Sequence, residues 1–179
     1  MTSQAAELDA LKLALKMETD GYHFFKDASA RTKNPLAKET LESFARWELE
    51  HIEYIKKMHK ALETSGTWLS TENLSQKQGD ALSAIKTIFK EKHEKLAETV
   101  RVNVTDLDAF RLARDIEDKA TVFYRERADK ATDKAAKKFY QFMIGLEREH
   151  YQILDNSYRY FENPEQWNIE DEGWMFDGG

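Results

Sequence analysis

Residues 44–54 read FARWELEHIEY and place Glu48 and His51 on a helix face that is otherwise apolar. Residues three apart in a helix lie on the same face, with about 5 to 6 Å between their Cβ atoms. This stretch therefore predicts a Glu-x-x-His pair that points into a helical core. A single pair is weak evidence, because chance alone gives roughly half such a motif in a chain of this composition.

The same motif recurs 99 residues later in residues 142–154, FMIGLEREHYQIL, as Glu147 and His150. A shift of 99 also superimposes residues 11–25, LKLALKMETDGYHFF, on residues 110–124, FRLARDIEDKATVFY, without a gap. One offset relates both pairs of segments. The sequence therefore predicts an internal repeat of two helical hairpins, and two such hairpins make a four-helix bundle.

Apolar residues at three-and-four spacing predict the four helices. Asn34 with Pro35 is typical of a helix start, Ser65 with Gly66 of a helix end, and the last helix is expected to begin near Asp133. We expect one bundle domain and a short acidic, aromatic tail. Its predicted parts are hairpins at about 5–63 and 105–161, a crossover at 64–104 with an extra helix, the whole domain at 1–163 and the tail at 164–179.

Composition narrows the classes of function. Only 7 glycines and 2 prolines among 179 residues favour long helices. The net charge of -6, without a block of Lys and Arg, argues against nucleic acid as a partner. No apolar run approaches the ~20 residues that span a bilayer, so we expect no membrane partner and a cytoplasmic protein. The absence of cysteine excludes thiolate metal sites.

Two further glutamates, Glu18 and Glu117, are also 99 residues apart and complete a set of six inward-facing side chains. Four carboxylates in a low-dielectric core could not all stay ionised, but two divalent cations would neutralise them. Oxygen and nitrogen ligands without sulfur suit iron, our first choice, or manganese, which remains open. The predicted metal ligands are Glu18, Glu48, His51, Glu117, Glu147 and His150.

A lone Glu followed by Glu-x-x-His, twice over, resembles the diiron domain of the rubrerythrins in the ferritin-like superfamily. The resemblance covers roughly residues 8–62 and 107–161. It implies an all-α, ferritin-like bundle in which the same six side chains hold two irons. It also implies an oxidoreductase that reacts with hydrogen peroxide or dioxygen.

Two departures from the family pattern weaken the inference of peroxide reduction. Peroxidase rubrerythrins usually carry an extra glutamate one turn after the lone Glu of the third helix, where this chain has Ala120, mirrored by Gly21. They also usually carry a four-cysteine rubredoxin domain, so an external electron donor is expected here. Gly21 and Ala120 either let helices pack closely or leave space beside the metals for dioxygen or peroxide.

Two tyrosines follow the lone glutamates, Tyr22 four residues after Glu18 and Tyr124 seven residues after Glu117. Either could hydrogen-bond a ligand carboxylate, and either could serve core packing instead. No catalytic residue is expected beyond the metal ligands.

Three functions are carried forward. The first is a diiron oxidoreductase with peroxide or dioxygen as oxidant, acting as a homodimer. The second is a ferroxidase that handles iron. The third is a non-catalytic helical module in which the metals stabilise the fold or sense iron or oxygen.

Overall fold

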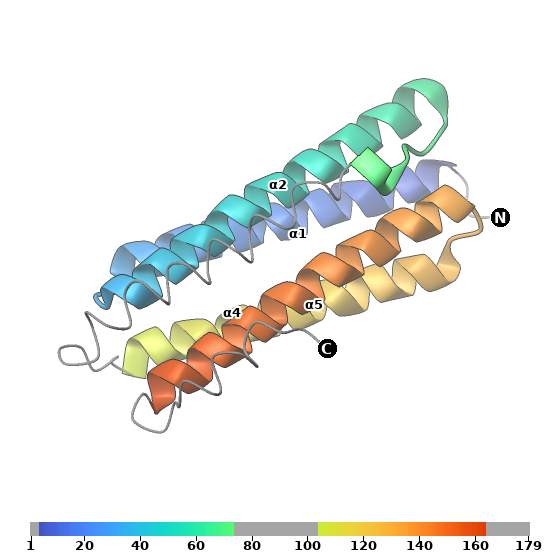
Figure 1. Ribbon diagram of the computed structural model, residues 1–179. Helices are drawn as coiled ribbons and strands as arrows, with labels where there is room; N and C mark the ends of the chain where they lie inside the picture. The colour runs from blue at the N-terminus through green and yellow to red at the C-terminus, as the bar shows by residue number, and fades with distance from the viewer. Residues whose placement is uncertain (1–3, 74–103, 164–179) are drawn as a thin grey trace.

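The computed structural model describes residues 4–73 and 104–163, and this part of the chain forms an all-helical bundle without strands (Figure 1). The predicted fold class is confirmed. The predicted crossover helix and the tail lie outside the described residues. The elements are α1 (Gln4–Arg31), α2 (Pro35–Ser65), the short 3-10 helix η1 (Thr71–Asn73), α4 (Val104–Lys130) and α5 (Lys134–Glu162).

The helix ends are set by capping residues that can be recognised in the sequence. Asn34 accepts hydrogen bonds from two backbone N–H groups of the first turn of α2, and Pro35 occupies the start of that helix, where its missing N–H is harmless. Gly66 ends α2 with φ of 67°, a left-handed conformation that glycine adopts without steric cost. Asp133 caps α5 in the same way as Asn34 caps α2. The predicted boundaries at these positions are confirmed.

The four long helices pair as two hairpins (Figure 1). Helices α1 and α2 pack along each other, and so do α4 and α5. The hairpins then meet through α1 against α4 and α2 against α5. Within the described residues, no helix is long and apolar enough to cross a membrane.

The apolar core is divided into two clusters of buried side chains. One joins the C-terminal half of α1, including Phe25, to the start of α2, including Phe44, and to the end of α5. The other joins the N-terminal half of α1 to the end of α2 and to Tyr140 of α5. Six buried acids and histidines lie on the helix turns between the two clusters, so apolar packing shields them at both ends: Glu18, Glu48, His51, Glu117, Glu147 and His150.

A partly buried ion pair joins the two hairpins at one end of the bundle. Nη2 of Arg127 lies 3.1 Å from Oε2 of Glu7, and the Tyr140 hydroxyl donates to the same oxygen at 2.7 Å. Because hydrogen bonds to charged groups are stronger than neutral ones, these contacts fix how α1 lies against α4 and α5.

Candidate metal centre

The structure brings the six predicted side chains together in the middle of the bundle, and none is more than 6% exposed. Helices α1 and α4 each supply a glutamate, and α2 and α5 each supply a Glu-x-x-His pair. The side chains form three overlapping groups whose candidate ligand atoms lie within 4.8 Å of one another. These groups are Glu48, His51 and His150; Glu18, His51 and Glu147; and Glu117, Glu147 and His150.

His51 lies among three carboxylates. Its Nδ1 is 3.0 Å from Oε2 of Glu18, in a hydrogen bond between α2 and α1. The same nitrogen lies 3.2 Å from Oε1 of Glu147 and 3.9 Å from Oε2 of Glu48. One ring nitrogen cannot donate to all of these oxygens, so His51 alone does not satisfy the acids around it.

Three buried atoms of the cluster make no hydrogen bond to any described residue: Oε1 of Glu117, Oε1 of Glu147 and Nδ1 of His150. The nearest carboxylate oxygen to His150 Nδ1 is Oε2 of Glu117, at 3.6 Å. Buried polar atoms are normally paired, because an unpaired one costs about 1 to 3 kcal/mol. A divalent cation bound by oxygen and nitrogen would pair all three atoms, so the residues present fit a metal site.

The carboxylates differ strongly in pKa. Burial would raise the pKa of Glu18, but the hydrogen bond and charge of His51 lower it to about 2. Burial, followed by the charge of Glu18, raises the pKa of Glu48 and of Glu147 well above the usual value. Burial raises the pKa of Glu117 to about 7. In the absence of cations, protonation of three acids therefore replaces the missing positive charge.

The two histidines also differ. Burial alone would lower the pKa of His51, but the charge of Glu147 and the hydrogen bond to Glu18 outweigh burial and raise it well above its usual value. Burial, with the charge of His51 added, lowers the pKa of His150 to about 4. His51 and Glu18, whose pKa values shift in opposite directions, are therefore both favoured in their charged forms, as an ion pair between α2 and α1.

Of the two tyrosines, only Tyr124 reaches the cluster. Its hydroxyl donates to Oε1 of Glu18, across from α4 to α1, and burial raises its own pKa well above the usual value. Tyr22 is half-buried and packs beside the core, with Nζ of Lys26 at 5.6 Å from its ring centroid. No hydrogen bond within the described part of the chain joins Tyr22 to a carboxylate of the cluster.

An aromatic stack that was not predicted extends from the histidines. The ring of Trp47 stacks on His150 with centroids 5.0 Å apart, and His150 stacks on His51 at 4.8 Å. Trp47 directly precedes Glu48, whereas the matching position 99 residues later is Leu146. This difference between the two motifs could have identified Trp47 from the sequence as a residue peculiar to one half of the cluster.

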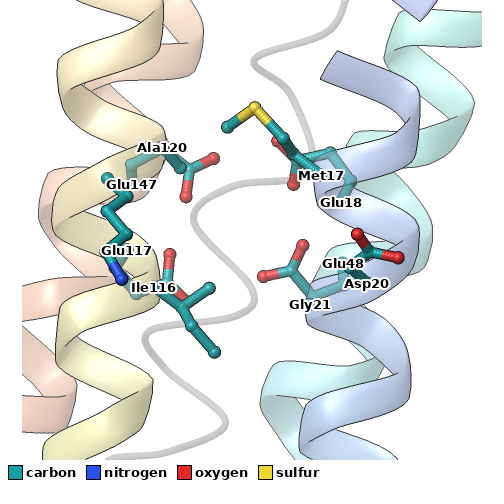
Figure 2. A pocket seen from close by; sticks show the side chains of 10 residues that line it. Met17, Glu18, Asp20, Gly21, Glu48, Ile116, Glu117, Ala120 and Glu147 are labelled. Carbon is teal, nitrogen blue, oxygen red and sulfur yellow. The ribbon is translucent and has the colours of Figure 1, made fainter. Parts of the chain in front are cut away.

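A cavity of about 210 Å³ borders the carboxylates between α1 and α4 (Figure 2). Gly21 and Ala120 both line it, so the two small residues lie beside the predicted metal site. A Cβ atom added at Gly21 would lie 3.4 Å from the carboxyl carbon of Glu48, in van der Waals contact with that side chain. The lining residues are Met17, Glu18, Asp20, Gly21, Glu48, Ile116, Glu117, Lys119, Ala120 and Glu147.

Comparison with known proteins agrees with this geometry. The family model described as Rubrerythrin matches residues 9–158, a span that contains all six side chains of the cluster. No curated protein and no solved structure matches the chain. Since the family match covers most of the chain, both hairpins included, this protein belongs to the rubrerythrin family.

Proposed function

We propose that this protein is a diiron oxidoreductase that uses hydrogen peroxide or dioxygen as its oxidant. The observation that carries the proposal is the set of three buried, unpaired atoms on Glu117, Glu147 and His150 at the centre of four carboxylates. Four carboxylates buried this close together are unfavourable without cations. The match to the rubrerythrin family supports two metal ions as the occupants of the site. Two irons, when bound, would supply two electrons for reduction of the oxidant.

The proposed ligands are the six side chains predicted from the sequence. Each half of the bundle gives one lone glutamate and one Glu-x-x-His pair, so four carboxylates meet two divalent ions and the charges cancel. Iron is preferred to zinc, because closed structural zinc sites commonly use thiolate ligands, whereas this cluster has four carboxylates and no thiolate. Manganese is the second candidate.

The protein's own groups prepare the site for cations. Binding requires the neutral acids Glu48 and Glu147 and the cationic His51 to lose their protons, so metal binding releases protons. Tyr124 donates a hydrogen bond to Glu18 and thereby holds one of that carboxylate's oxygens in place. The apolar clusters at both ends keep water from the ligands, and the cavity beside Gly21 and Ala120 gives the oxidant a route to them.

The chain lacks cysteine and therefore carries no rubredoxin-type site, so electrons are proposed to come from an external donor. We further propose that the protein acts in the cytoplasm as a homodimer.

The test uses protein loaded anaerobically with two ferrous ions per chain and mixed rapidly with peroxide or with dioxygen. We expect oxidation of the iron, followed optically, to be much faster than in a Glu117→Ala, Glu147→Ala double variant. Asp118→Asn, at an exposed position next to Glu117, is the matched control and should behave like the natural chain. Equal rates in the natural chain and the double variant would refute the proposal, and a preference for dioxygen with release of ferric iron would favour the ferroxidase function instead.

A further inference from the structure

The cavity beside the carboxylates is larger than hydrogen peroxide or dioxygen requires. Its volume is about 210 Å³, whereas a water molecule occupies about 30 Å³ of liquid and a cavity of about 150 Å³ can hold benzene. Two metal ions at the carboxylate end would fill only part of this space. The remainder has room for a molecule with several carbon atoms.

The walls of the cavity carry apolar side chains, whereas its inner end is polar. Four carboxylates lie at the inner end, while Met17 on α1 and Ile116 on α4 contribute apolar side chains on its two sides (Figure 2). Both are only partly buried, so part of their apolar surface is available to a ligand. Ala120 adds a methyl group to the lining. Apolar walls contribute binding energy only when a ligand covers them with apolar surface.

The charges around the cavity leave little net charge for a ligand to face. Two divalent ions would neutralise the four carboxylates, and the other charged lining residues are Asp20 and Lys119, both exposed and of opposite sign. A neutral molecule with one polar end and one apolar end fits this lining.

We propose that a further oxidant is an organic hydroperoxide, ROOH, whose small alkyl group R packs against Met17, Ile116 and Ala120 while its peroxide group faces the metal ligands. This inference rests on the diiron function proposed above and adds a substrate class to it. Reduction breaks the O–O bond and gives the alcohol ROH and water, and it consumes two protons and two electrons. The two electrons come from the external donor, and the metal pair, when bound, would carry them to the peroxide.

The kinetic test compares tert-butyl hydroperoxide with hydrogen peroxide on protein loaded with ferrous iron. The quantity measured is the second-order rate constant for tert-butyl hydroperoxide divided by that for hydrogen peroxide. Ala120→Leu fills the cavity and should lower this ratio at least tenfold. Ile116→Phe narrows the cavity from one turn earlier in α4 and should act in the same direction if the first variant fails to fold. Val122→Leu, at an exposed position of α4, is the control and should keep the natural ratio.

A binding test needs no turnover. Protein loaded with zinc, which cannot be oxidised, is titrated with tert-butanol, and the methyl signals of the methionines are followed by NMR. Of the three methionines in the described residues, the Met17 signal should move and those of Met58 and Met143 should not, because the latter two are buried in the core away from the cavity lining. Ala120→Leu should abolish the shift.

The outcomes separate the two proposals. Fast reaction with hydrogen peroxide, together with no reaction with the organic peroxide and no shift of Met17, would overturn this inference and leave the diiron function standing. No reaction with either peroxide would overturn the peroxidase function and this inference with it. An unchanged rate ratio in both cavity variants would also overturn it.

Discussion

Without metal, the stability of the bundle should fall as the pH rises from about 5 to about 6.5. Three buried acids, Glu48, Glu117 and Glu147, have pKa values raised above the usual 4.5 in the folded protein. In this pH range the unfolded chain has lost the three protons, while the folded chain still holds them. A group with a raised pKa stabilises the fold below its unfolded pKa, and this contribution is lost as the pH rises toward the folded value.

The pKa shift of one histidine changes the stability with pH in the opposite direction from the shifts of the three acids. The pKa of His150 is lowered from 6.5 to about 4, so between these values the unfolded chain binds a proton that the folded chain does not. The folded state therefore holds about two more protons than the unfolded state, three from the acids less one from His150. The free energy of unfolding should fall by about 3 kcal/mol per pH unit. Since domains are commonly stable by only 5 to 15 kcal/mol, the effect is large.

Denaturant unfolding in the presence of a chelator, at several pH values between 5 and 6.5, measures this slope. The control is the Glu48→Gln, Glu147→Gln double variant, which lacks two of the three acids with a raised pKa, so its slope should be much shallower. Stability that is constant or rises with pH in the natural chain would refute the electrostatic reasoning about the cluster. Adding ferrous iron without oxygen should remove the fall, because cations then replace the protons.

Two further predictions concern the surroundings of the centre. Tyr124→Phe removes the hydrogen bond to Glu18 and should weaken metal binding about tenfold, measured by competition with a coloured chelator; unchanged affinity would show that the bond does not orient the carboxylate. Iron binding should quench the fluorescence of Trp47, because its ring stacks on His150, a proposed ligand. Trp47→Phe should remove that part of the quenching. Equal quenching in the variant would show that the signal comes from another tryptophan.

Much of this arrangement could be predicted because it depends on local rules. The caps at Asn34 and Asp133 and the glycine end at Gly66 are set by backbone groups within a few residues. The inward position of His51 and His150 follows from helix periodicity on apolar stripes. These rules need no knowledge of how one helix lies against another.

The contacts between hairpins could not be predicted in this way. Tyr22 and Tyr124 were equal candidates for a hydrogen bond to a carboxylate, but only Tyr124 makes one, to Glu18 on the other hairpin. The stacking of Trp47 on His150 likewise depends on the distance and rotation between α2 and α5. Helix spacing fixes neither quantity. The internal repeat, the domain limits and the metal ligands stay predictions.

The hydroxyl of Tyr124 has no counterpart at Phe25, which lies 99 residues earlier and stacks instead on Phe44 at 5.1 Å. A dimer assembled from two copies of one hairpin would carry the same side chain at both places. Covalent linkage of the hairpins frees each half to differ, so the two halves of this cluster of acids and histidines are chemically unlike.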